Sequence, residues 1–201
     1  MNSVRKIGRP TTLDKNHVLA VALKAYWDHG PLGVSIDKIC AIAGVSKPSV
    51  YREFGSGDSL IAVALQDYFE KYLIPLIESL RVGRSLLHNL THYASAEFAQ
   101  KACNAGINGC LFVKMYNQMH LLGPISLQKV LEVNVAMLIR YESIVSEAQQ
   151  KGRIVDHLPP KILAAYIHNQ LILVASQRGR GEDSAKIEQL SKIAFSVLSN
   201  D

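Results

Sequence analysis

The segment between Ser35 and Phe54 constrains the fold more than any other part of the sequence. It carries Gly44 and Pro48 close together, yet apolar residues flank both of them at helical spacing. Glycine adopts a left-handed backbone without strain and so ends a helix, whereas proline fits the first turn of a helix, where its missing N–H costs nothing. The pattern therefore predicts two short helices joined by a tight turn.

A further helix is expected before this segment. Apolar residues recur there at positions i, i+3, i+4, i+7 and i+8, namely Val18, Val21, Ala22, Ala25 and Tyr26. Residues 11–14 offer N-cap side chains for it, and the Gly- and Pro-containing stretch 28–33 ends it. Ser35 and Ser46 are the expected N-caps of the next two helices. Together these signals predict a helix-turn-helix over residues 35–54.

The outward face of the third helix is the first candidate for function. Its side chains are polar, form hydrogen bonds and are net positive: Lys47, Ser49, Tyr51 and Arg52. A helix exposed in this way and braced by two others can enter the major groove of DNA. Lys47 and Arg52 can reach phosphates or guanine edges, and the Tyr51 hydroxyl suits a phosphate. The alternative is a plain corner of a helical bundle with a solvated face.

The net charge of +5 is concentrated at one end of the chain. Residues 1–54 hold eight lysines and arginines against four acidic residues, which leaves a net charge of +4 there. This asymmetry favours a polyanionic partner, either nucleic acid or an anionic membrane face, although a solvated basic tail would give the same count. The apolar runs are shorter than a bilayer span, and no signal peptide is expected.

In order and spacing, these features resemble the DNA-binding head of the TetR family, especially its AcrR-like members. The stretches that carry the resemblance are Gly8-Arg-Pro10, the helix ending Ala25-Tyr-Trp-Asp-His-Gly30, and Ser35 to Gly55. The resemblance implies an all-α protein with a homeodomain-like helix-turn-helix head at residues 1–56. Residues 57–201 would form a helical ligand-binding and dimerisation domain. A ligand-responsive transcriptional regulator, most often a repressor of a palindromic operator, is implied rather than an enzyme.

The resemblance also implies roles for individual residues toward double-stranded DNA. Ser35 and Tyr51 would touch phosphates, whereas residues 47–49 would face the bases. An N-terminal arm from Arg5 to Arg9 would follow the backbone or the minor groove. The complete set of predicted DNA-contacting residues is Arg5, Arg9, Ser35, Ser46, Lys47, Pro48, Ser49, Tyr51 and Arg52.

The start of the fourth helix departs from the family pattern. Family members often carry a lysine just after the Phe-Gly pair, where it holds a phosphate. This chain has Ser56-Gly57-Asp58 instead. That phosphate contact is therefore lost or provided by a backbone N–H, which affects affinity more than site preference.

Beyond residue 58 the sequence predicts a helical bundle, to a total of about nine helices and no strand. The expected helices span residues 60–80, 86–102, 111–122, 126–151, 160–177 and 184–198. Pro75 lies inside the first of these and is expected to kink or break it.

The last two predicted helices carry more apolar surface than the edge of a monomer needs. In the TetR family the corresponding hairpin pairs with a second copy in a four-helix dimer interface. The predicted contacts in this homodimer are Ile162, Tyr166, Leu173, Leu190, Ile193 and Val197. Packing of the same stripes on other helices of one chain is the alternative.

A pocket for a small-molecule inducer is expected within residues 86–141. Its candidate lining is Phe112, Met115, Tyr116, Met119, His120, Met137 and Tyr141. Methionine and aromatic stripes of this kind are also ordinary core. A solid core would favour the second hypothesis for function, a constitutive or architectural DNA-binding protein without an inducer.

The cysteine and histidine residues raise three further hypotheses about chemistry: a redox pair, a metal site and a catalytic pair. Three cysteines without metal spacing suit a reducing cytoplasm, and Cys103 and Cys110 could be a redox pair or buried structural thiols. His88 and His92 could share a metal, but no third ligand is positioned beside them, so polar lining or surface is preferred. Cys110 with His120 lacks an oxyanion loop or nucleophile elbow. No catalytic residue, metal or cofactor is expected.

Overall fold

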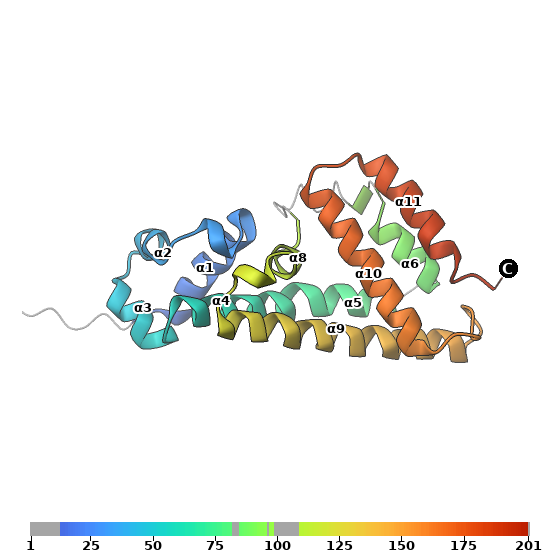
Figure 1. The fold of residues 1–201 in the computed structure, drawn as a ribbon, viewed down its shortest axis with the longest axis horizontal. Coiled ribbons are helices and arrows are strands. Elements are labelled where there is room, and N and C mark those ends of the chain that lie inside the picture. The colour runs from blue at the N-terminus through green and yellow to red at the C-terminus, as the bar shows by residue number, and fades with distance from the viewer. Residues whose placement is uncertain (1–12, 82–84, 96, 99–108, 201) are drawn as a thin grey trace, which may run out of the picture.

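The computed structural model describes residues 13–81, 85–95, 97–98 and 109–200, and these residues form helices without any strand (Figure 1). The α-helices are α1 (Lys15–His29), α2 (Ile36–Ala43), α3 (Lys47–Phe54), α4 (Gly57–Tyr68), α5 (Ile74–Ser79), α6 (Leu86–Tyr93), α8 (Leu111–Tyr116), α9 (Pro124–Gln150), α10 (Pro160–Gly179) and α11 (Ser184–Ser196). The predicted all-α class is confirmed.

Helices α1 to α3 form the head, and local side chains begin each of them. Asp14, Ser35 and Ser46 each accept a hydrogen bond from the backbone N–H three residues further on, at 3.1, 3.2 and 3.4 Å. Such N-caps satisfy donors that a helix leaves unpaired. Gly44 ends α2 at φ +67°, in the left-handed region that glycine tolerates best. The turn between α2 and α3 follows the predicted pattern.

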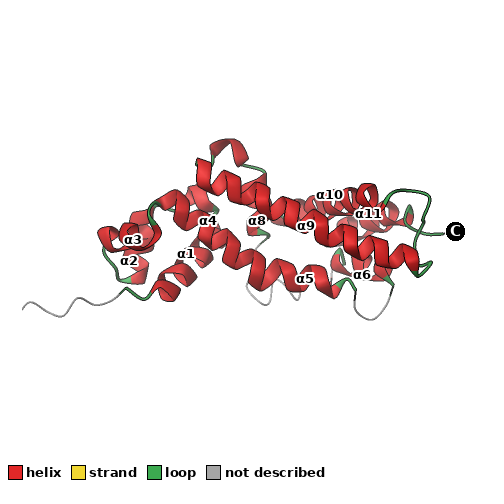
Figure 2. Ribbon diagram, turned by 90° about the horizontal axis from the view of Figure 1, so that it is seen from below, coloured by secondary structure: helices red, strands yellow, loops and turns green. Residues whose placement is uncertain are grey.

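The long helix that leaves the head is continuous past its proline. A π-helical segment, Phe69–Leu73, joins α4 to α5, and Figures 1 and 2 show the three segments as one run. Ile74 donates its N–H to the carbonyl of Phe69, five residues back. A proline cannot donate to the helix and crowds the preceding turn, so the wider π-turn accommodates Pro75. Where a kink or break was expected, the structure therefore has a π-turn, and the helix continues through it.

Two predicted helices are shorter in the structure. The helix expected over residues 86–102 ends at Tyr93, and residues 99–102 lie outside the described part of the chain. The helix expected over 111–122 ends at Tyr116 and is followed by a 3₁₀ turn, Met119–Leu121. Tight i to i+3 bonds, such as Gln118 N–H to the Met115 carbonyl at 3.0 Å, close the end of α8. The spacing of apolar residues alone does not predict where such tight turns end a helix.

The body is built around α9, a helix of 27 residues that packs on α4 and α5 along one side and on α10. Figures 1 and 2 both show α9 running beside α4 and α5 along the length of the molecule. Helix α11 packs on α10 and α6. One hydrophobic core extends from the head, at Val18, to the end of the body, at Leu198. No helix of the described residues is long and apolar enough to cross a membrane.

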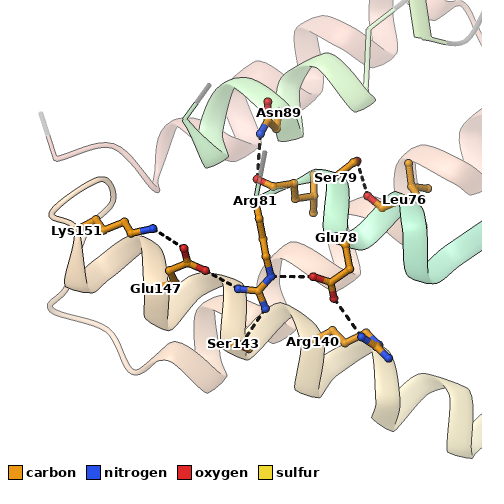
Figure 3. A network of polar contacts seen from close by, with 10 residues as sticks. Leu76, Glu78, Ser79, Arg81, Asn89, Arg140, Ser143, Glu147 and Lys151 are labelled. Carbon is orange, nitrogen blue, oxygen red and sulfur yellow. Dashed lines mark hydrogen bonds and ion pairs between the residues drawn. The ribbon is translucent and has the colours of Figure 1, made fainter. Parts of the chain in front are cut away.

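A polar network at the far end of the body ties α5, α6 and α9 together (Figure 3). The Arg81 guanidinium donates to Glu78 at 2.9 Å and to Glu147 of α9 at 2.6 Å. Asn89 of α6 donates to the carbonyl that precedes Arg81, at 2.9 Å. Partly exposed ion pairs stabilise by less than about 1 kcal/mol each, so this network fixes geometry more than it adds stability.

A hydrogen-bonded carboxylate joins the start of α4, the helix that follows the head, to the start of α9. Asp58, in the first turn of α4, accepts from the backbone N–H groups of Ile125 and Ser126 at 2.8 and 3.2 Å and from the Ser126 hydroxyl. It therefore caps α9 from a different helix. Gly123 lies so close to this carboxyl group that an added Cβ would come within 2.4–2.6 Å of it. The predicted domain boundary between residues 56 and 57 falls beside this joint and stays a prediction.

Candidate DNA-binding surface and ligand pocket

Helix α3 presents one face to the core and the other to solvent. Val50 and Phe54 are buried, whereas Pro48 and Arg52 are exposed and Tyr51 is 39% exposed. The helical period therefore separates the packing residues from those predicted to meet DNA. The structure brings the predicted residues of α3 together on one accessible surface.

Lys47 is held on this surface by the neighbouring helix. Its Nζ lies 2.9 and 3.1 Å from the two carboxylate oxygens of Asp37 in α2 and 5.9 Å from the centre of the Tyr51 ring. The hydrogen bond to Asp37 raises the pKa of Lys47. The cation is thus oriented in the free protein, and a phosphate has to compete with Asp37 for it.

The predicted serines have a local structural role as well. Ser35 and Ser46 are exposed, and their hydroxyl oxygens accept the N-cap hydrogen bonds of α2 and α3. The Ser46 and Ser49 hydroxyls lie 2.8 Å apart. A hydroxyl that accepts a cap hydrogen bond keeps its own proton for donation, so these caps stay compatible with phosphate contacts. Arg5 and Arg9 lie outside the described residues.

The sequence of the head identifies its family. Residues 18–64 match the family described as "Bacterial regulatory proteins, tetR family", and this match spans α2, α3 and the turn between them. The DNA-binding head of this chain is that of the TetR family. Over 199 residues it is 25% identical to the HTH-type transcriptional repressor ComR of Escherichia coli (strain K12), with 95% of this chain and 90% of ComR covered. The chain is therefore a transcription regulator and not an enzyme.

Solved structures of this family share the whole fold. The reduced form of NemR from E. coli superposes with a TM-score of 0.76 at 17% identity, over 92% of this chain and 96% of NemR. A cysteine mutant of the TetR-family regulator CifR, complexed with 26-bp operator DNA, superposes with a TM-score of 0.75 at 19% identity, over 94% and 98% of the two chains. The superposition therefore includes the helical body as well as the head.

Helices α10 and α11 carry two adjoining rows of exposed apolar residues. The five aliphatic side chains predicted for the dimer are between 45% and 70% exposed: Ile162, Leu173, Leu190, Ile193 and Val197. Tyr166, in the α10 row, donates its hydroxyl to the Ala194 carbonyl of α11 at 2.6 Å. That hydrogen bond brings the two rows side by side, so they form one apolar surface on the monomer. The outer face of α9 has a third row, Leu131, Val135 and Ile139, which sequence reasoning missed.

The predicted pocket residues are distributed over the body. Phe112, Met137 and Tyr141 line an inner cavity of about 30 Å³ together with His168. This volume holds about one water molecule. The Nδ1 of His168 has no hydrogen-bond partner in the described part of the chain, and burial lowers the pKa of this side chain to about 4. Of the other candidates, Met115 is buried, Tyr116 and Met119 are half-buried, and His120 is exposed.

A larger cavity of about 750 Å³ lies between the head and the body. Among the described residues that line it are five aromatic side chains, Trp27, Tyr68, Tyr72, Tyr93 and Phe98. The Trp27 ring meets the rings of Tyr68 and Tyr72 edge-on, at centroid distances of 4.8 and 4.7 Å. Sequence reasoning missed this cavity because it is lined by α1 of the head together with α10, which are far apart in the chain.

Helix α8 lies between the head and α10 and is bonded to the head at this cavity (Figure 1). The Lys114 ammonium donates to the carbonyl oxygens of Trp27 and Asp28, in the last turn of α1. Trp27 returns a hydrogen bond from its indole N–H to the Gly109 carbonyl at 2.9 Å. A cation is favourable at the carbonyl end of a helix. Partial burial lowers the pKa of Lys114.

The cysteines and histidines form no additional centre in the described residues. Burial raises the pKa of Cys110, whose thiol hydrogen-bonds with Tyr68, so the thiol is not activated as a nucleophile. Cys103 lies outside the described residues. His88 and His92 stack with their ring centroids 6.3 Å apart. No group of three or more metal-binding side chains occurs in the described part of the chain.

Proposed function

We propose that this regulator is a dimeric repressor that binds a palindromic operator through α3 and releases it when a small molecule binds in the body. The observation that carries the proposal is the accessible polar face of α3, with Lys47 and Tyr51 already oriented on it. The similarity to a protein named as a transcriptional repressor supports the direction of regulation.

The apolar surface on α10 and α11 supports the dimer. Two recognition helices have to reach successive major grooves, which are about 34–36 Å apart, and one chain has one such helix. Exposed apolar patches of this kind mark interaction sites, and a face made of two helices can pair with its own copy about a two-fold axis. The predicted residues on α10 and α11 would then form a four-helix interface.

The 750 Å³ cavity supports an inducer. Small-molecule sites have volumes of about 300–1,000 Å³ and are lined mostly by apolar and aromatic side chains. The cavity borders the continuous run from α4 to α5, which belongs to both the head and the body. A ligand that tilts this run would change the separation of the two heads. Operator affinity would then fall by the factor by which the ligand binds the tilted state more tightly than the DNA-binding state.

The proposal is tested on a DNA fragment that the wild-type protein selects from a random library. Lys47→Ala and Tyr51→Ala should each weaken binding about 10-fold or more, because each removes a side chain from the exposed face of α3. Loss of one phosphate contact should also reduce the salt slope by about one. Lys24→Ala, which removes the same charge from α1, is the control.

Unchanged binding by both α3 variants in a mobility-shift titration would show that α3 is not the recognition helix.

Spin labels at residue 49 of each protomer test how a ligand releases the DNA. The distance between the labels should change when an inducer releases the DNA. If the DNA is released while that distance stays the same, the tilt of α4 is wrong and direct competition replaces it.

A further inference from the structure

Two cations face the 750 Å³ cavity from the body, and neither is paired with a carboxylate of the described residues. They are Lys114 on α8 and Arg178 on α10. The acidic side chains of the cavity wall already have other partners: Asp28 pairs with Lys24 at 2.9 Å and Glu182 with Arg180 at 2.6 Å. The aromatic wall of the cavity therefore has two cations that form no ion pair with a described residue.

Arg178 is the more deeply held of the two cations. One amino group donates to the carbonyls of Tyr93 and Ser95 at 2.6 and 3.1 Å, and the guanidinium lies 5.3 and 5.4 Å from the ring centres of Tyr93 and Phe98. Its Nε–H is buried and finds no acceptor among the described residues. Buried donors are almost always hydrogen-bonded, so this guanidinium is one whose donors the described residues do not fully use. Burial also lowers the pKa of Arg178.

We propose that this cavity binds a small aromatic carboxylate, with its carboxylate on Arg178 and its ring among Trp27, Tyr72 and Tyr93. The guanidinium suits this role because Nη2 is held by the carbonyls of Tyr93 and Ser95, which leaves the Nη1 amino group to donate to an ionised acceptor. The aromatic side chains bind the apolar body by burial and by edge-on ring contacts. This inference names the chemical class of the inducer and rests on the proposed function for its regulatory meaning.

The same site gives the ligand a direct route to the head. Lys114 donates to two neutral carbonyl oxygens at the end of α1. A carboxylate is a stronger partner for an ammonium group than a neutral carbonyl is. Negative charge bound on Arg178 in the same cavity therefore attracts Lys114 and weakens the bond between α8 and the head. An uncharged analogue of the same shape lacks this competition.

The test compares charged and neutral probes on the wild-type chain by isothermal titration calorimetry. The panel is benzoate, 2-naphthoate and indole-3-acetate, each with its primary amide. The carboxylates should bind about 10- to 100-fold more tightly than the amides, because a hydrogen bond to a charged group is replaced by a neutral one. Trp27, the single tryptophan of the chain, lines the cavity and should report binding by a change in fluorescence.

Variants assign the charge to its residue. Arg178→Gln should reduce the preference for carboxylates to less than about 3-fold, and Arg178→Lys should restore part of it. Arg153→Gln, on the exposed loop after α9, removes an arginine far from the cavity and should leave the preference unchanged. Lys114→Met should keep carboxylate binding measurable while it reduces the effect of the ligand on operator affinity.

Three outcomes overturn the inference: amides that bind as well as carboxylates, an Arg178→Gln chain that keeps the full preference, or a panel in which nothing binds by millimolar concentration. The proposed function fails separately. If carboxylates bind through Arg178 and the operator complex is unaffected, the carboxylate site is confirmed but it is not the inducer site. If a neutral amide releases the operator, control by a ligand is confirmed and the assignment of a carboxylate as the inducer is wrong.

Discussion

The head and the body of this regulator fix their helices in different ways. In the head, each of α1, α2 and α3 begins at a side chain that caps a backbone N–H three residues away. In the body, α9 is capped by Asp58, which is 67 residues from Ile125. The cavity between them depends on Lys114 and the end of α1, 86 residues apart. The head is specified locally, and the body is specified by contacts between distant segments.

This difference matches what the two regions have to do. A surface that meets a regular DNA groove has to keep one shape, and short helices with local caps keep it without help from the rest of the chain. A region that responds to a ligand has to have more than one arrangement of similar free energy. Contacts between distant helices, such as the bond from Lys114 to α1, can be exchanged without unfolding a helix.

The largest expected effect comes from separating two copies of the body. Leu190→Glu with Ile193→Glu should convert dimers into monomers, because both side chains lie on the exposed apolar surface of α10 and α11. Operator affinity should then fall about 1,000-fold or more, toward the non-specific level, while the head stays folded. Light scattering measures the mass, circular dichroism the helix content, and a mobility shift the binding.

Ile139→Glu on α9 is the matched control, since Ile139 is 62% exposed and Ile193 is 70% exposed. It should leave the mass and the operator affinity unchanged. If Ile139→Glu gives monomers and the α11 variant stays dimeric, the interface lies on α9. If the monomeric variant binds the operator as tightly as the dimer does, a single head is sufficient for binding. The proposed role of the body in DNA binding is then wrong.

How much could be predicted from the sequence follows the same division. The caps Ser35 and Ser46, the turn at Gly44 and the exposed face of α3 depend on neighbours in the chain, so the pattern of residues predicted all of them. The rows of apolar residues on α10 and α11 were also readable, because helical spacing marks one face. The cavity was not, because Trp27 and Arg178 meet only after α1, α8 and α10 have packed.

Asp58 illustrates the same limit at a single residue. The sequence drew attention to this position because a lysine is common there in the family. Its carboxylate instead accepts from two backbone N–H groups at the start of α9. Nothing near Asp58 in the chain signals a partner so far away. The close approach of Gly123 is equally invisible until the two helix ends meet.

An intermediate effect is expected from removing one cap of each kind. Asp58→Ala should lower the free energy of unfolding by about 1–3 kcal/mol, because a charged acceptor is lost from several donors at once. Asp14→Ala removes the local cap of α1, a single hydrogen bond at 3.1 Å, and should cost about 1 kcal/mol. Urea unfolding of both variants at one protein concentration measures the two values.

Equal losses in the two aspartate variants would mean that the long-range cap between α4 and α9 stabilises the fold no more than a local cap does. A loss of operator affinity in Asp58→Ala at unchanged stability would point instead to a role at the DNA surface. Asp58→Asn separates charge from shape, since the amide oxygen can still accept one hydrogen bond.

The smallest expected effect comes from the ion pair within the head. Asp37→Asn removes the carboxylate that holds Lys47 at 2.9 Å, so a phosphate no longer competes with it. Exposed ion pairs are worth about 0.2–1 kcal/mol, so operator affinity should rise about 2- to 5-fold. Asp67→Asn breaks the similar Lys71–Asp67 pair on α4 and controls for the change in net charge. Both are measured by mobility shift at one salt concentration. If Asp37→Asn weakens binding, Asp37 acts by orienting Lys47 rather than by competing for it. The head would then need a contact between two helices to function, and its local specification would extend to its fold but not to its DNA-binding surface.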